Sequence, residues 1–173
     1  LVRSRGLGDV YKRQHYGRIH QNGANYQEAM HYYLTAEKYA LAAHKNYYLG
    51  LVYTRIGELY SEQMNFNGAL EYYRNAYDAW KKLRNPAFMN NATLNIANTY
   101  SSLNDNDNAV KYYLQALQAA RQQGDNDMVI ACLSNLGDIY VSKGDYPKAL
   151  QAVKEIERTA PDGLSIYQYR VLA

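Results

Sequence analysis

The chain has 173 residues, with 19 lysines and arginines against 16 aspartates and glutamates, a formal net charge of +3, and 47% hydrophobic residues. This length and composition fit one domain or one array of repeats around a core, and they exclude a disordered segment. The single cysteine excludes a disulfide framework or a zinc site built from cysteines, and no apolar run is long enough to span a membrane. The basic balance would suit nucleic-acid binding, so the positions of the basic residues matter.

Four of the basic residues lie in residues 1–14, a segment that we expect to be non-native. Read as codons, residues 4–14 resemble the in-frame end of a transposon adapter used in DNA sequencing. Removing four basic residues and Asp9 leaves 15 residues of each sign. The rest of the chain is then electrically neutral, and its composition no longer supports a nucleic-acid partner for this segment.

From residue 15 onwards, several columns of residues recur at a spacing of forty without a gap, which is the signature of a repeat architecture. Two columns hold only small residues, a third holds a small residue in three of its four copies, and two hold mainly tyrosine. The columns are Gly17, Gly57, Ala97 and Gly137; His20, Tyr60, Tyr100 and Tyr140; Ala29, Ala69, Ala109 and Ala149; Tyr33, Tyr73, Tyr113 and Val153; and Ala36, Ala76, Ala116 and Ile156.

Each copy has the periodicity of two helices. In the second copy, Tyr53, Ile56 and Tyr60 follow helical spacing, and a second stripe begins at Ala69. The spacing predicts helix pairs that begin near residues 49, 89 and 129. We expect N-caps between the helices of each pair and left-handed residues just before two of them. The predicted N-caps are Asn25, Asn65, Asp105 and Asp145, the left-handed residues are Asn104 and Gly144, and Pro86 and Pro161 fall in connections between copies.

These columns resemble the tetratricopeptide repeat, whose pattern places Leu-Gly and Tyr on the first helix and Ala, an aromatic residue and Ala on the second. Ile56-Gly57, Tyr60, Ala69, Tyr73 and Ala76 hold these roles here. The resemblance implies an all-α fold, a right-handed α-solenoid of antiparallel helix pairs. The forty-residue period exceeds the usual one of the family by about six residues, as in its longer variety.

The same register divides the chain into an adapter-derived segment and repeats. We expect repeat 1 at residues 15–49 with a truncated first helix, repeat 2 at 50–89, repeat 3 at 90–129 and repeat 4 at 130–162. Residues 163–173 would begin a fifth repeat. Neither end shows the polar capping helix that solenoids need, so we expect a fragment of a longer protein.

The resemblance further implies that the chain binds a peptide or protein segment on the concave surface lined by the first helix of each pair. Helical geometry places the residues off the buried stripe on that surface. The candidates are Arg18, Thr54, Arg55, Glu58, Asn91, Asn95, Asn98, Ser134, Asn135 and Asp138, with Glu62 on the same face.

Asparagines carry the sharpest form of this hypothesis. Asn95 and Asn135 share a column, and an amide can both donate to and accept from an extended peptide backbone. The alternative is that these are solvated polar residues, and Arg55 and Glu58 can pair with each other. A basic clamp for a terminal carboxylate is not expected, because Leu51, Thr54 and Ala131 occupy positions where it would need basic residues.

Catalysis, a cofactor and a metal site are not expected. The four histidines form no pair at metal-ligand spacing, Cys132 has the pattern of a small buried residue, and only Glu58 and Asp138 are candidate acidic groups in the groove. The tyrosine pairs beginning at Tyr32, Tyr72 and Tyr112 are interpreted as packing. A second functional reading makes the chain the regulatory or sensor array of a larger bacterial signalling protein, a transcription regulator or sensor kinase, whose effector domain lies elsewhere.

Overall fold

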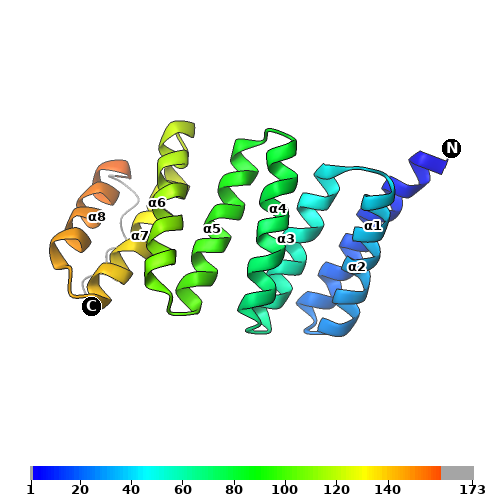
Figure 1. Ribbon diagram of the computed structural model, residues 1–173, viewed down its shortest axis with the longest axis horizontal. Helices are drawn as coiled ribbons and strands as arrows, with labels where there is room; N and C mark the ends of the chain where they lie inside the picture. The colour runs from blue at the N-terminus through cyan, green and yellow to red at the C-terminus, as the bar shows by residue number, and fades with distance from the viewer. Residues whose placement is uncertain (1, 161–173) are drawn as a thin grey trace. The chain divides into compact units, whose positions relative to one another are not determined.

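The computed structural model describes the backbone of residues 2–160 and the side chains of residues 8–160. Within these residues the chain is all-α, as predicted, with each helix antiparallel to the next within its pair (Figure 1). The expected fifth repeat at 163–173 and Pro161 lie outside the described residues. The helices are α1 (Val2–Asn22), α2 (Tyr26–Ala42), α3 (Asn46–Glu62), α4 (Phe66–Lys82), α5 (Pro86–Ser102), α6 (Asn106–Gln123), α7 (Asn126–Ser142) and α8 (Tyr146–Thr159).

Every described turn has the same construction. From α2 onwards the helices begin every twenty residues, so each forty-residue copy contains two halves of equal length. A residue with positive φ follows each of the helices α1 to α7, and the next N–H donates back to a carbonyl five residues earlier, as Asp105 does to Tyr100 at 2.9 Å. Asn104 and Gly144 have φ of 57° and 73°, which confirms the predicted left-handed residues.

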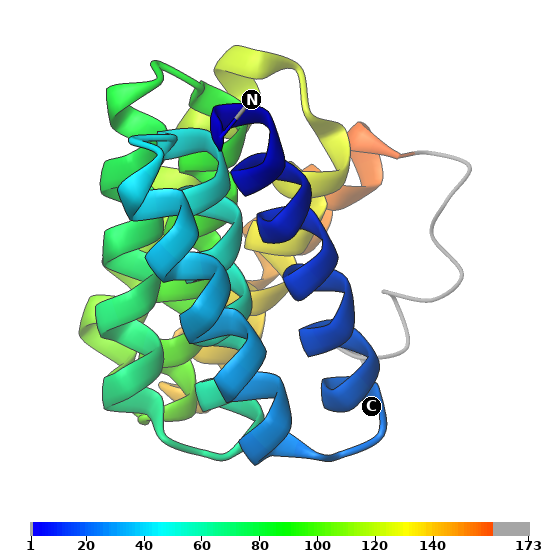
Figure 2. The ribbon, with the colours of Figure 1, turned by 90° about the vertical axis from the view of Figure 1, so that its right-hand side faces the viewer.

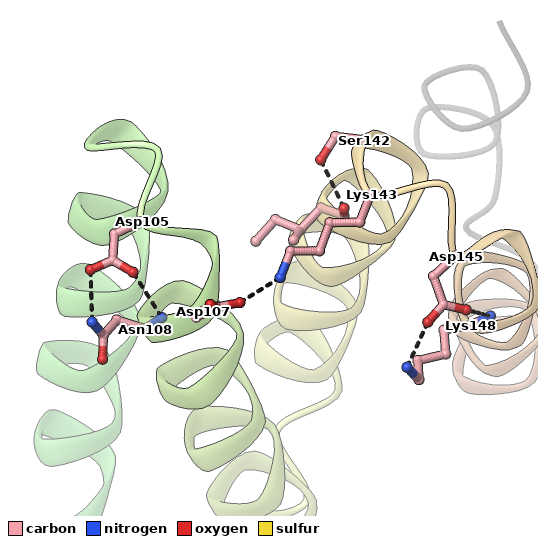
Figure 3. Close-up of polar contacts among 8 residues, drawn as sticks. Asp105, Asp107, Asn108, Ser142, Lys143, Asp145 and Lys148 are labelled. Carbon is pink, nitrogen blue, oxygen red and sulfur yellow. Dashed lines mark hydrogen bonds and ion pairs between the residues drawn. The ribbon is translucent and has the colours of Figure 1, made fainter.

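Three of the four predicted N-caps bond as expected. The side chains of Asn65, Asp105 and Asp145 each accept from the backbone N–H three residues later, while Asn25 holds the N-cap position without such a bond. Figure 3 shows Asp105 with Asn108 and Asp145 with Lys148. Hydrogen bonds from the side chains of Asn108 and Lys148, with a smaller contribution from the backbone N–H groups, hold the pKa of both aspartates below the ordinary value.

The first helix of each pair begins three residues before the predicted start, at residues 46, 86 and 126. Pro86 is the first residue of α5, where a missing N–H costs nothing, so this proline opens a helix and does not lie in a connection. Asp125 caps α7 by accepting from the N–H of Met128 at 3.0 Å. The repeat boundaries drawn at 50, 90 and 130 therefore fall at the fifth residue of a helix.

The chain divides into two compact units, residues 1–92 and 93–173, and the boundary falls within α5. In the first unit, α1 and α2 lie side by side (Figure 2). Their contact depends on a small residue: a Cβ added to Gly17 would lie 2.4 Å from Cε1 of Tyr33. Gly57 and Tyr73 repeat this arrangement between α3 and α4, which confirms the packing role of the small column.

Residues 2–14 continue α1 without a break. Val10, inside the segment expected to be non-native, is completely buried in the core of the first unit with Ala40 and Val52. The segment is therefore part of the folded helix, and its adapter origin stays a prediction from the codons.

The core of the second unit is built from α6, α7 and α8 together with the C-terminal part of α5. Tyr113, Cys132 and Leu136 are almost fully buried in it. Outside the core, Lys143 of the α7–α8 turn pairs with Asp107 of α6 at 2.6 Å (Figure 3). None of the helices in residues 2–160 combines the length and the apolar character that a membrane crossing requires.

A carboxylate lies among tyrosines in the first unit. Glu37 of α2 accepts a hydrogen bond from Tyr53 of α3, whose ring lies 6.0 Å from that of Tyr72. Burial raises the pKa of Glu37 above its ordinary 4.5, against the opposing effect of the Tyr53 hydrogen bond, and burial raises the pKa of Tyr72 to about 12. The folded chain therefore binds the Glu37 proton more tightly than the unfolded chain does.

We predict that this carboxylate makes stability fall as pH rises. With a raised folded-state pKa, the stabilising contribution of Glu37 is complete below the unfolded value and is lost as pH rises through the folded value. Replacing Glu37 by glutamine keeps an acceptor for Tyr53 and removes the titration. Thermal melts at about pH 4 and about pH 7 should show a smaller decrease in Tm for E37Q than for the parent. Parallel curves for the two proteins would contradict the assignment.

Candidate functional site

Three of the candidate residues of the first unit lie on α3 and form local polar contacts. Arg55 and Glu58 of α3 form an ion pair at 2.7 Å, and the Thr54 hydroxyl donates to the Gly50 carbonyl at 2.9 Å. The pair is partly exposed, so its contribution to stability is small. Arg18 of α1 lines the same shallow depression as Arg55, of about 150 Å³. The other residues that line it are Tyr11, Gln14, His15 and Leu51.

A hydrogen-bond chain that the sequence did not predict joins three helices beside these residues. The Tyr33 hydroxyl of α2 donates to Gln21 Oε1 of α1 at 2.7 Å, and Gln21 Nε2 donates to Glu62 of α3 at 2.7 Å. Burial raises the pKa of Tyr33 to about 12, so the phenol stays protonated as the donor. Tyr33 thus carries a hydroxyl from the second helix of its pair to a polar side chain of the first helix.

In the second unit, too, a tyrosine of a second helix bonds to a polar side chain of a first helix, here an asparagine. Buried Tyr113 of α6 donates its hydroxyl hydrogen to Asn98 Oδ1 at 2.7 Å, which leaves the amide NH₂ of Asn98 as a donor. On α7, Asn135 Nδ2 donates to the Ala131 carbonyl at 2.9 Å, which leaves its Oδ1 as an acceptor. Within the described residues the Asn95 side chain has no hydrogen-bond partner. The face therefore offers both donors and acceptors.

The remaining candidates differ in accessibility. Asn91 and Asp138 are exposed, as the helical spacing predicts. The Ser134 hydroxyl oxygen is enclosed and has no hydrogen-bond partner among the described residues, so Ser134 does not present its polar atom on the surface. Periodicity assigns a side chain to a face but does not show whether neighbouring side chains cover it.

Sequence reasoning also missed Asn90, next to Asn91. Asn90 is 3% exposed, and neither polar atom of its side chain has a partner within the part of the chain that the structure describes. Its column holds Val10, Gly50 and Ile130 in the other copies, so a polar residue in an apolar column was the available signal. A buried unpaired amide of this kind costs free energy of about 1–3 kcal/mol.

The groups that could support other chemistry are used for packing. Cys132 is completely buried, and burial raises the pKa of its thiol to about 12, which disfavours a thiolate nucleophile. His20 stacks on Tyr32 with ring centroids 5.3 Å apart, so its imidazole serves packing in the column that holds tyrosine in the other copies. Across residues 8–160, no three His, Cys, Asp or Glu side chains lie close enough together to hold a metal ion.

Comparison with known proteins identifies the repeats. Residues 88–162 match the model of the tetratricopeptide repeat family. Among curated proteins, none matches the chain. Residues 88–162 therefore contain tetratricopeptide repeats, and the paired helices of residues 2–160 have the fold that such repeats form.

Solved structures share this all-α, solenoid-type fold. Aspartyl phosphate phosphatase F from Bacillus subtilis has a TM-score of 0.82 at 15% identity, and the match covers 98% of this chain and 44% of that one. A STAND-family signal transduction ATPase with a tetratricopeptide repeat sensor, from Pyrococcus horikoshii, has a TM-score of 0.80 at 18% identity, over 94% and 25%. The Rap conjugation gene regulator of plasmid pLS20, solved with the Phr* peptide, has a TM-score of 0.69 at 20% identity, over 96% and 52%. The chain spans about half or less of these three proteins.

Proposed function

We propose that the chain is a non-catalytic protein–protein interaction module that binds a peptide or protein segment on the first helices of its repeats. The matched family is a repeat family typical of protein binding, and the pLS20 Rap regulator of similar fold was solved with a peptide. The proposed contact residues lie on α1, α3, α5 and α7.

The observation that carries the proposal is the set of amide atoms left available on α5 and α7. Asn98 has a free NH₂, Asn135 has a free Oδ1, and Asn95 has both groups available, as far as the described residues go. An extended peptide presents an N–H and a C=O at every residue, so such a mixed set can hold its backbone without reading its sequence. Tyr113 and the Ala131 carbonyl hold two of these side chains in place, which reduces the entropy lost on binding.

The test is a peptide-display selection on the 173-residue chain, followed by calorimetry with a selected peptide. Changing Asn95 and Asn135 together to alanine should weaken binding by about tenfold, since one or two net hydrogen bonds are lost. The midpoint of urea unfolding should change little, because both side chains are partly exposed.

The matched control changes two amides on the second helix of a pair. Gln115 and Gln118 of α6 are exposed and lie outside the proposed surface. Their double alanine variant should bind the selected peptide with the affinity of the parent. Equal affinity of the N95A/N135A variant and the parent would count against the asparagine surface, and failure to select any peptide would count against the module.

A second candidate function is that of a regulatory or sensor array in a larger signalling protein. The similar fold of the Pyrococcus horikoshii ATPase favours this reading, because that protein has a tetratricopeptide repeat sensor and this chain matches a quarter of it. The full-length gene tests it directly: a helix-turn-helix or kinase signature in the same reading frame would support the sensor role. A complete gene consisting of repeats alone would support the binding module.

A further inference from the structure

One column of the repeat stacks an aromatic ring from the second helix on a ring from the first. Tyr32 stacks on His20 at 5.3 Å, and Tyr112 on Tyr100 at 5.4 Å, between ring centroids. In the second copy Tyr72 lies 5.6 Å from Tyr60. The fourth copy has the first-helix ring, Tyr140, but the partner position is Ala152.

The first unit shows what normally fills the space beside this stack. Tyr72 contacts Tyr53 as well as Tyr60, and Glu37 bonds to the Tyr53 hydroxyl, so a third ring and a carboxylate lie beside the stacked pair. Eighty residues later, an alanine takes the place of Tyr72, and leucines take the places of Tyr53 and Glu37. Neither ring is present there, and neither is the carboxylate. The three residues in those places are Ala152, Leu133 and Leu117.

A pocket of about 250 Å³ lies at this place in the second unit. Its apolar lining is Leu114, Leu117, Leu133, Leu136, Tyr140 and Ala152, from α6, α7 and α8. Apolar cavities of about 150 Å³ already accept a benzene ring, so the volume suffices for one substituted ring. None of the residues proposed above to contact peptide lines this pocket.

The rim of the pocket is polar and partly fixed. Arg121 of α6 and Glu155 of α8 form an ion pair across it, with Arg121 Nε donating to Glu155 Oε1 at 3.1 Å. Lys148 Nζ lies 5.4 Å from the centroid of the Tyr140 ring. An apolar floor with charged groups at the mouth suits a ring that carries one polar substituent.

We propose that this pocket binds a single phenol-like ring, which stacks on Tyr140 in the place of the missing tyrosine of the fourth copy. The ring lies between α6 and α8 over Leu133 and Leu136, and its hydroxyl points to the rim of Arg121, Glu155 and Lys148. The same chemistry belongs to a free phenolic molecule and to a tyrosine side chain of a partner. The proposal does not depend on peptide binding by the first helices.

The test uses p-cresol, which is the tyrosine side chain as a free molecule. Titration into the methyl-labelled chain should shift the methyl resonances of the four lining leucines, with saturation at a dissociation constant of about 1 mM. The saturated analogue 4-methylcyclohexanol should bind several-fold more weakly, because it cannot stack on Tyr140. N-acetyl-tyrosinamide distinguishes the sources: binding at least as tight as p-cresol indicates a peptide side chain, and weaker binding indicates a free phenol.

Two variants of Ala152 and one control variant make the assignment specific. Ala152→Tyr restores the ring of the other copies and should reduce p-cresol affinity by at least about tenfold while raising Tm. Ala152→Leu is a smaller filler with the same expected direction, should the tyrosine variant fail to fold. Gln118→Tyr adds a tyrosine at an exposed position of α6 and should leave binding unchanged. Absence of saturable shifts, unchanged affinity in both Ala152 variants, or equal binding of 4-methylcyclohexanol would overturn the proposal.

Discussion

Replacing Trp80 by alanine is expected to lower the free energy of unfolding by about 3–5 kcal/mol, the largest of the effects predicted for this chain. Trp80 of α4 is 1% exposed and stacks on Phe88 with centroids 4.4 Å apart. Its indole also lies against bare backbone of α3, since a Cβ on Gly50 would be 2.4 Å from Cε2. Truncation would leave a cavity bordered by a glycine, which has no side chain to fill it.

The other copies suggest how this cavity could be refilled. The columns of Gly50 and Trp80 hold Ile130 and Ala160 in the fourth copy, and these two residues pack in the same core. In the second copy the small residue is on the first helix, as Gly50, and the large residue is on the second, as Trp80. In the fourth copy the large residue comes first, as Ile130, and the small residue second, as Ala160. Gly50→Ile alone should destabilise the chain by about 3 kcal/mol, because its side chain meets the indole. In the W80A background the same change should recover about 1–2 kcal/mol.

Urea unfolding followed by circular dichroism measures all four members of this cycle. The expected signature is a change of sign: Gly50→Ile is destabilising beside Trp80 and stabilising in the W80A background. The slope of the transition should be similar in all four proteins, because unfolding exposes nearly the same surface. If the effects of the two changes simply add, the two columns do not share space and the size-pairing argument is wrong.

How much of this fold the sequence predicts depends on the kind of signal. The forty-residue columns, the caps Asp105 and Asp145 and the left-handed Asn104 and Gly144 are local features that each residue type favours for its own reasons. The predicted starts of α3, α5 and α7 are three residues late, and Pro86, expected in a connection, is the first residue of α5. A proline at the first helical position and one in a loop look alike without the preceding N-cap, here Asn85, which accepts from Phe88.

The candidate surface was less predictable, because hydrogen-bond partners come from other helices. Spacing places Asn98 on a face, but only the fold brings the Tyr113 hydroxyl to its Oδ1. Similarly, helical spacing places Ser134 on the predicted face, but its hydroxyl oxygen is enclosed in the structure. The pocket beside Tyr140 could have been found from the sequence, since Ala152 breaks the tyrosine column, but a missing ring is a signal only once the stack is known.

Two glycines of one column, Gly57 and Gly137, should respond to replacement by alanine with stability changes of opposite sign. In a helix interior, glycine to alanine gains about 1 kcal/mol from propensity. At Gly137 the new Cβ would meet only the Cβ of Ala152, at 4.0 Å, so Gly137→Ala should stabilise the chain by about 0.5–1 kcal/mol. At Gly57 it would lie 2.6 Å from Cε1 of Tyr73, a ring that is 5% exposed.

Gly57→Ala should therefore destabilise the chain by about 1 kcal/mol net, because overpacking of about 1–3 kcal/mol exceeds the propensity gain. The third copy shows that alanine is possible in this column: Ala97 shares a core with Tyr113, which is still 1% exposed. The α3–α4 pair must move apart to reach such an arrangement, and the lost contacts are the cost. Since both glycines have the same propensity, the difference between the two variants in urea unfolding measures the cost of the contact with the Tyr73 ring.

Replacing Tyr73 by valine, the residue of the fourth copy, should make Gly57→Ala stabilising. A destabilisation that persists in that background would mean that another group obstructs the new methyl group.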